Sequence, residues 1–163
     1  MLRLLKRSIL KRSIIAALIV FLMAPPLAAD EWPHPGTRSQ VSGKSFAELV
    51  TALNTAIKNN GMFAVTKASA SAGAKRRGID IAGNMVIGVF RNDYAVRMLA
   101  ASVEAGMEAP LRFYITGQSD GSASLTYRTP TAIFAPYGSA DLDEMASDLD
   151  IIFAAIAAQA VAP

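Results

Sequence analysis

The sequence from residue 111 to residue 128 reads LRFYITGQSDGSASLTYR, and it is the strongest structural signal in the chain. Apolar Leu111, Phe113 and Ile115 alternate with more polar side chains in the first run, and residues 122–128 alternate in the same way. The connecting GQSDG contains an Asp-Gly pair, which is typical of a tight turn between strands. The stretch therefore predicts a β-hairpin with one apolar face and one polar face, and the apolar face must pack against other elements.

Amphipathic helices flank this hairpin in the sequence. Ser45 and Glu48 form a capping-box pattern at the start of one helix, and Gly61 is placed to end it. Residues 93–105 and 141–160 also carry apolar side chains at helical spacing. In the helix at 93–105, we expect the buried face to contain Val96, Leu99, Ala100 and Val103.

Shorter apolar runs supply the other strands. Residues 62–68 alternate in a mixed way, and residues 85–90 form a continuous apolar run that is typical of a buried strand. Residues 71–77, which lie between these runs, are compatible with a short helix that Gly78 stops. The predicted fold class is therefore α+β, with a single sheet of about four strands that includes the C-terminal hairpin, and helices packed mainly on one face.

The first 29 residues have the pattern of a secretory signal peptide. Five basic residues precede an apolar run at 14–24, and Pro25-Pro26 and two alanines follow it. The run is shorter than the roughly 20 residues that a transmembrane helix needs. We predict a signal peptide over residues 1–29, a linker over 30–43 and a single domain over 44–163. The expected location is periplasmic or secreted, and the alternative is an uncleaved N-terminal membrane anchor.

Removing this leader reverses the net charge. The chain has 16 basic and 13 acidic residues, and five of the basic ones but none of the acidic ones lie in residues 1–29. The remainder therefore has 11 basic and 13 acidic residues, a net charge of −2. A nucleic-acid partner is not expected, because it requires a basic patch on the folded domain. The absence of cysteine excludes disulfides, thiolate catalysis and cysteine metal sites.

Three motifs carry a resemblance to a known family. They are Pro110-Leu111-Arg112-Phe113-Tyr114, then Asp120-Gly121, then Leu125-Thr126-Tyr127-Arg128-Thr129-Pro130. In this order and spacing, they resemble the hairpin of the family called domain of unknown function 302, and the resemblance extends over about residues 45–160. It implies a small α+β domain that is sometimes exported, often forms a homodimer and has no settled biochemical activity. The family supplies no catalytic residues for this chain.

Two motifs suggest chemistry, but their context argues against it. Gly117-Gln118-Ser119-Asp120-Gly121 has the pattern of a nucleophile elbow, which requires a strand-to-helix turn and a histidine. The motif lies between two predicted strands, and the only histidine, His34, lies in the predicted linker beside Trp32. The aspartates at 141–150 lack the spacing of an EF-hand. We predict no catalytic residue, no metal and no cofactor, and the sequence favours a protein that is not an enzyme.

The basic cluster Lys75, Arg76 and Arg77 is the first candidate binding site. It follows small residues at 71–73 that are able to open a helix, and a helix N-terminus with nearby cations holds anions. The same cations suit the anionic headgroups of a membrane surface. The alternative is a charged face that simply stays in water.

The polar face of the hairpin is the second candidate binding site, and it contains Arg112, Tyr114, Thr126 and Arg128. We interpret the protein as an exported, periplasmic binding or interaction module. The alternatives are a carrier of small apolar ligands, with a pocket between sheet and helices, or an enzyme of unrecognised type. The expected partners are a second copy of the chain, an anionic small molecule or a membrane surface.

Overall fold

The structure of the chain is a computed structural model, and it describes residues 32–163. The predicted signal peptide, residues 1–29, lies outside the described residues. No helix within the described residues is both long enough and apolar enough to cross a membrane.

One open antiparallel sheet of five strands organises the described residues, in the order β1-β5-β4-β3-β2. The predicted hairpin is confirmed, and it consists of β4 (Leu111–Gly117) and β5 (Ala123–Arg128). β3 (Asn84–Phe90) pairs with β4, and β2 (Phe63–Ala68) pairs with β3 and forms one edge of the sheet. β1 (Thr37–Ser42) pairs with β5 and forms the other edge. The α+β class is confirmed, but the sheet has five strands rather than about four.

The additional strand comes from a segment that the sequence predicted to be a linker. β1 runs antiparallel to β5 along its whole length, from Thr37 opposite Arg128 to Ser42 opposite Ala123. Ser42 is its one buried residue. Apolar periodicity misses this strand, because an edge strand held by main-chain pairing buries few side chains.

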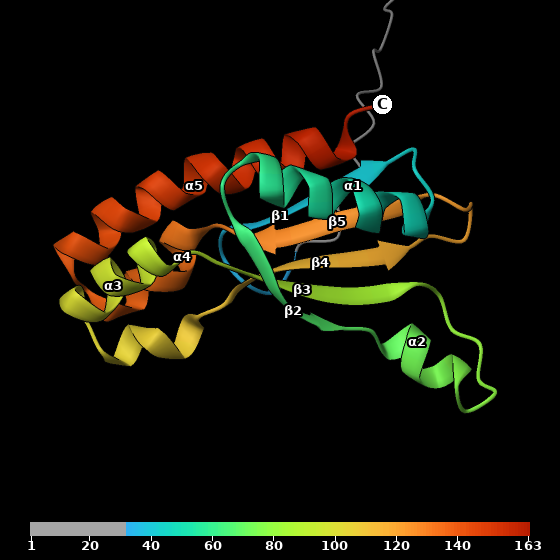
Figure 1. Cartoon of the computed structure of the whole chain (residues 1–163), viewed down its shortest axis with the longest axis horizontal. Coiled ribbons are helices and arrows are strands. Elements are labelled where there is room, and N and C mark those ends of the chain that lie inside the picture. Colours follow the sequence, from blue (N-terminus) through green and yellow to red (C-terminus); the bar gives the residue numbers. More distant parts are fainter. Residues whose placement is uncertain (1–31) are drawn as a thin grey trace, which may run out of the picture. The chain divides into compact units, whose positions relative to one another are not determined.

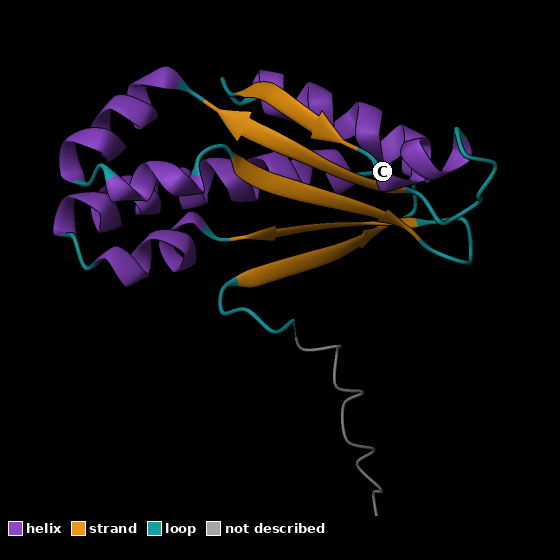
Figure 2. Cartoon of the chain, turned by 90° about the horizontal axis from the view of Figure 1, so that it is seen from below, coloured by secondary structure: helices purple, strands orange, loops and turns teal. Residues whose placement is uncertain are grey.

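Two long helices cover one face of the sheet and leave the other face open. α1 (Phe46–Asn59) and α5 (Ala140–Val161) lie side by side on the covered face, and Figure 2 views the sheet from its open face with these helices behind it. The core lies between these layers, where the rings of Phe113 and Phe153 stack with centroids 4.8 Å apart. The prediction that the helices pack mainly on one face is confirmed.

Shorter helices gather at the two ends of the sheet (Figure 1). One end has α3 (Asn92–Ala101) with the 3₁₀ helix η1 (Glu104–Glu108), and α4 (Pro130–Phe134) with η2 (Ala135–Tyr137). α2 (Ala70–Lys75) lies at the opposite end. α4 and η2 have no counterpart among the predicted elements, because a helix of five residues is too short to show periodicity.

The predicted buried face of α3 is wrong. Val96 and Leu99 are exposed, and Val103 lies beyond the end of the helix and is also exposed. Tyr94 and Met98 contact the core instead, because α3 lies at the end of the sheet and only a narrow stripe of it touches other elements. Residues four apart share a helix face, so Tyr94 and Met98 define that stripe.

The predicted cap of α1 is confirmed. The side chain of Ser45 accepts from the backbone N–H of Glu48, and a carboxylate oxygen of Glu48 accepts from the backbone N–H of Ser45 at 2.8 Å. The hydroxyl of Ser45 also donates to this carboxylate at 2.7 Å, and this bond, together with the one from the backbone N–H of Ser45, holds the pKa of Glu48 below its ordinary value. Gly61 follows the helix with φ +70°, so it takes the left-handed conformation expected of it.

Candidate functional site

The open face of the sheet contains a groove with a volume of about 290 Å³. The four residues predicted for the polar face of the hairpin all line it: Arg112, Tyr114, Thr126 and Arg128. Trp32 and His34, from the segment before β1, also line it. The structure therefore brings the four residues of the second predicted site together. It also adds three residues that the sequence analysis assigned to a linker, which are Trp32, His34 and Thr37.

Strand alternation explains why these side chains share one face. Tyr114 lies opposite Thr126 in the β4–β5 pair and opposite Val86 in the β3–β4 pair, and Thr37 lies opposite Arg128. Residues that face each other across strands point to the same side of a sheet, and so do residues two apart along one strand. The groove thus crosses β1, β5, β4 and β3 on their uncovered side.

A short N-terminal arm, residues 32–36, forms one wall of the groove. It turns back beside the start of β1 (Figure 2), and the carbonyl of Gly36 accepts from the backbone N–H of Thr129 at 2.9 Å. The carbonyl of His34 accepts from Oγ1 of Thr37 at 2.8 Å. The bond from Thr129 ties the arm to the junction of β5 and α4, and the bond from Thr37 ties it to the start of β1. Trp32, 43% exposed, thus lies at the groove.

The charges in the groove all have one sign. Its lining includes two arginines and no carboxylate. Arg128 donates from Nη2 to the carbonyl of Ala132 at 3.2 Å, whereas its buried Nε has no hydrogen-bond partner. Arg112 is exposed. A guanidinium binds a carboxylate or phosphate through paired hydrogen bonds, so the groove suits an anion.

Polar contacts fix the floor of the groove. Oγ1 of Thr126 shares a hydrogen bond of 2.8 Å with Oγ of Ser39, and Nδ2 of Asn84 donates to the hydroxyl of Tyr114. The hydroxyl of Tyr114 therefore keeps its own proton to donate to a ligand. Tyr127 packs toward Phe113, and burial raises the pKa of its phenol. It therefore stays neutral and adds no negative charge.

The family model described as "Domain of unknown function DUF302" matches residues 38–159. The chain belongs to this family. The crystal structure of an uncharacterized conserved protein DUF302 from Bacillus stearothermophilus is similar, with 18% identity and a TM-score of 0.69. The match covers 77% of this chain and 98% of that chain, and it shows the shared fold. No curated protein matches the chain.

The predicted family is thus confirmed, and the DUF302 match includes β1 as well as the hairpin. The match begins at residue 38, so the arm with Trp32 and His34 precedes it. The groove is therefore lined partly by residues of the DUF302 match and partly by residues that come before it.

The basic cluster of this DUF302 domain lies elsewhere. Lys75 is the last residue of α2, and Arg76 and Arg77 follow it. The N-terminus of α2 is capped by Ser69, whose side chain accepts from the backbone N–H of Ala72 at 3.1 Å. The cations thus lie at the end of α2 opposite to its capped N-terminus, so the helix N-terminus does not add to them, and anion binding by the cluster stays a prediction.

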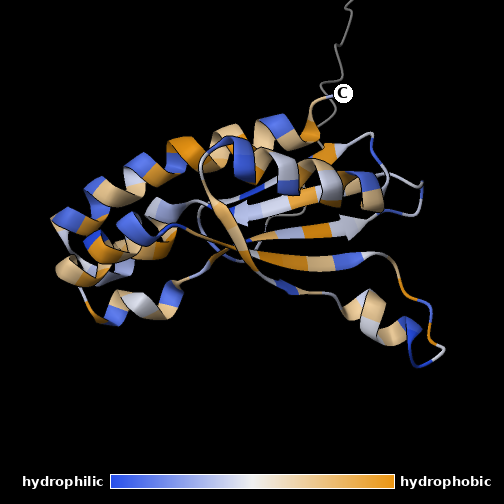
Figure 3. Ribbon diagram, viewed as in Figure 1, coloured by the Kyte–Doolittle hydropathy of each residue, from blue (hydrophilic) through white to orange (hydrophobic). Residues whose placement is uncertain are grey.

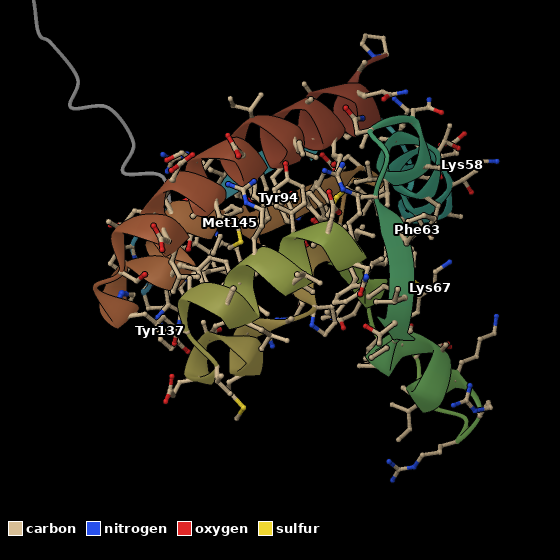
Figure 4. All side chains as sticks on the ribbon, turned by 60° about the vertical axis from the view of Figure 1, so that its left-hand side comes forward. Lys58, Phe63, Lys67, Tyr94, Tyr137 and Met145 are labelled. Atoms are coloured by element: carbon tan, nitrogen blue, oxygen red, sulfur yellow. The ribbon has the colours of Figure 1, made fainter. Side chains whose placement is uncertain are left out.

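A second cavity lies between the sheet and the helices, where an apolar carrier would need its pocket. Its lining includes Tyr94 and Met145, which face each other between α3 and α5 (Figure 4). The volume is about 30 Å³, which is room for about two water molecules. Arg91 lies at this cavity with its guanidinium 4.4 Å from the ring centre of Tyr94 and Nε 2.7 Å from Asp93. This cavity gives the carrier alternative no support.

The two motifs considered for chemistry have structural positions. Ser119 lies exposed in the turn that joins two antiparallel strands, β4 and β5, rather than in a turn from strand to helix. The carboxylate of Asp150 accepts from the backbone N–H of Thr131 at 3.0 Å and from its hydroxyl at 2.7 Å, and so anchors the start of α4. Within residues 32–163, no three His, Asp or Glu side chains are grouped as a metal site requires.

Proposed function

We propose that this member of the DUF302 family is an exported binding module whose groove takes a small organic anion. The observation that carries the proposal is the one-signed lining: Arg112 and Arg128 without a carboxylate, on a chain whose net charge after the leader is −2. The positive charge of the groove is thus a local property that does not follow from the net charge of the chain. The buried Nε of Arg128 also lacks an acceptor, which costs about 1–3 kcal/mol, and an anion that accepts from it removes this cost.

The other lining residues suggest a ligand with an apolar or aromatic body. Trp32 and Tyr114 offer ring surfaces, and Val86 and Ile133 offer aliphatic ones. The groove volume of about 290 Å³ is at the lower end of ligand sites. A small aromatic or aliphatic carboxylate or phosphate fits this combination of charge, surface and size.

The polar groups of the groove favour binding over turnover. A hydroxyl nucleophile needs an adjacent base, and the Thr126 hydroxyl is hydrogen-bonded to Ser39 instead. Nothing in the lining pairs a nucleophile with a carboxylate or with a histidine that a third group orients. An enzyme of unrecognised type remains the second candidate, and turnover of a bound anion is its test.

The export part of the proposal rests on the leader sequence. Cleavage after Ala29 leaves Asp30 as the first residue, two positions before the groove residue Trp32. N-terminal sequencing of the protein from the periplasmic fraction is expected to begin at Asp30. A protein that begins at Met1 and stays in the membrane fraction contradicts export by cleavage and supports the anchor.

The groove is tested by tryptophan fluorescence, because Trp32 is the only tryptophan of the chain. We expect benzoate and phenyl phosphate to change the Trp32 emission in a saturable way, and the neutral benzyl alcohol to have little effect. Arg112→Gln is expected to weaken benzoate binding by about tenfold, which corresponds to about 1.4 kcal/mol for one charged hydrogen bond. Arg77→Gln, which makes the same change outside the groove, leaves it unaltered.

Other outcomes decide between the candidates. Equal binding of benzyl alcohol and benzoate favours the alternative of an apolar-ligand carrier, with the groove as its binding site. Equal benzoate binding by Arg112→Gln and the unaltered protein contradicts the proposed site. The homodimer stays a prediction, and sedimentation of the chain without its leader tests it.

A further inference from the structure

We infer that the protein docks on anionic lipid membranes through the tip formed by residues 75–81. This inference does not depend on the groove. The tip contains the cations Lys75, Arg76 and Arg77, followed by Gly78, Ile79, Asp80 and Ile81.

The tip projects from the body of the protein. α2 has no buried residue, and together with the loop that follows it extends away from the sheet (Figure 1). A charged face that stays in water accounts for exposed cations. It does not account for the projection itself, because α2 buries no side chain in the core. The segment therefore projects from the body of the protein, where a flat partner is able to reach it.

Hydrogen bonds hold the base of the projection. Oγ of Ser71 accepts from the backbone N–H of Asn84 at 3.0 Å, and Oγ of Ser69 donates to the carbonyl of Asn84 at 2.8 Å. These bonds tie the start of α2 to the start of β3. The projection, residues 69–84, is thus a loop whose two ends are hydrogen-bonded to each other at the sheet.

The turn at the end of α2 is also fixed. The backbone N–H of Gly78 donates to the carbonyl of Lys75 at 3.0 Å, and that of Ile79 donates to the carbonyl of Ala74 at 3.0 Å. Gly78 has φ +75°. This is a Schellman motif, and it turns the chain sharply directly after the cations. It brings the isoleucines onto the same tip as the basic side chains.

Exposed isoleucines distinguish this tip from an ordinary charged loop. Ile79 is 46% exposed and Ile81 is 51% exposed, and Figure 3 shows strongly hydrophilic and strongly hydrophobic residues next to each other along this loop. A single exposed isoleucine needs no explanation. Two of them beside three cations match the pattern of membrane-surface segments, in which apolar side chains enter the headgroup region and cations meet the anionic lipids.

The charges of the tip are available to a partner. The ion pairs of residues 32–163 join Arg91 with Asp93 and Arg97 with Asp148, so the tip cations take part in neither. Asp80 is the one acidic residue of the tip. Each cation near an anionic membrane strengthens partitioning about fivefold, so three of them give about a hundredfold.

The test uses the chain that begins at Asp30, because residues 32–163 form one compact unit and the basic, apolar leader would itself bind lipid. Cosedimentation is measured with vesicles of phosphatidylcholine alone and with vesicles that also contain phosphatidylglycerol. We expect binding only to the anionic vesicles, and a decrease of about a hundredfold in partitioning for the Lys75→Gln, Arg76→Gln, Arg77→Gln variant.

A matched triple variant controls for total charge. Arg38→Gln, Lys44→Gln, Lys58→Gln removes the same three charges outside the tip and is expected to bind anionic vesicles nearly as well as the unaltered chain. Equal binding by the tip variant and the unaltered chain overturns the inference, as does the absence of binding to anionic vesicles. Equal loss in both triple variants also overturns it, because it assigns binding to total charge.

A second measurement tests the isoleucines without removing any charge. The chain has no cysteine, so Ile81→Cys accepts an environment-sensitive dye at one position. We expect a blue shift of this dye on anionic vesicles and none for the same dye at Met107→Cys, a position that is 88% exposed at the other end of the sheet. A shift at Met107 but not at Ile81 contradicts docking by the tip.

Discussion

Replacing Gly36 by alanine tests whether the N-terminal arm is fixed at the groove. Gly36 has φ +73°, a conformation that costs an L-residue about 1–2 kcal/mol. A Cβ atom at this position would lie 2.2 Å from the Cβ of Ala132 and 2.6 Å from Oγ1 of Thr129. Contacts this short force either the arm or α4 to move.

The arm is expected to move, because it has less to hold it. α4 is anchored by buried Ile133 and Phe134, whereas the arm is held mainly by the bond from Thr129 to Gly36, which contributes about 1 kcal/mol. Release of the arm also exposes the part of Trp32 that is now covered. We therefore expect the free energy of unfolding to fall by only about 1–3 kcal/mol, since release relieves the strain.

Trp32 reports this release directly. In Gly36→Ala, its emission is expected to move to longer wavelength, and quenching by acrylamide is expected to rise toward that of a free tryptophan. Benzoate binding weakens in parallel, because one wall of the groove is lost. Gly43→Ala is the matched control, since no atom lies within 4 Å of its added Cβ. Unchanged emission and quenching in Gly36→Ala would refute the argument for a fixed arm.

Three further predictions address the core, the first helix and the turn. Phe153→Ala is expected to lower the free energy of unfolding by about 3–5 kcal/mol in urea titrations, because its ring is fully buried against Phe113. Ile151→Ala, which changes a residue 73% exposed on the same helix, stays within about 0.5 kcal/mol. The Glu48→Gln variant is expected to lose less of its free energy of unfolding than the unaltered chain when the pH is lowered. A carboxylate with a lowered pKa stabilises the fold above its ordinary value of 4.5, and this stabilisation is lost as the pH falls through the lowered pKa. Urea midpoints at about pH 7 and about pH 3 measure this difference, and an equal acid-induced decrease in both proteins contradicts it. Ser119→Ala leaves the thermal midpoint and benzoate binding unchanged, and covalent labelling of Ser119 by a fluorophosphonate contradicts its assignment to a simple turn.

Local signals in the sequence predicted the features that depend on neighbours in the chain. The hairpin followed from strict alternation around an Asp-Gly pair, and the start of α1 followed from Ser45 and Glu48. The same alternation placed Arg112 and Arg128 on one face, so four of the ten residues that line the groove were predictable. The family resemblance supported the α+β class, and the family match confirms it.

The features that sequence reasoning missed depend on distant contacts. β1 is a strand because β5 lies beside it, and its own residues show no apolar alternation. Trp32 and His34 reach the groove because the arm turns at Gly36 and is tied to Thr129. The buried face of α3 was assigned to the wrong stripe, because periodicity identifies an apolar face but not the element against which the helix packs.

The pairing of β1 with β5 has a consequence for the synthesis of the chain. Ser39 and Thr126, which share a hydrogen bond across this pair, are 87 positions apart. At about 5–20 residues per second, the ribosome needs roughly 4–17 s to make the intervening chain. Throughout this interval β1 has no partner, so the sheet cannot close along this edge. The strand that is made first therefore gains its partner only after the last strand has been made, and β1 stays unpaired during nearly all of the synthesis of the sheet.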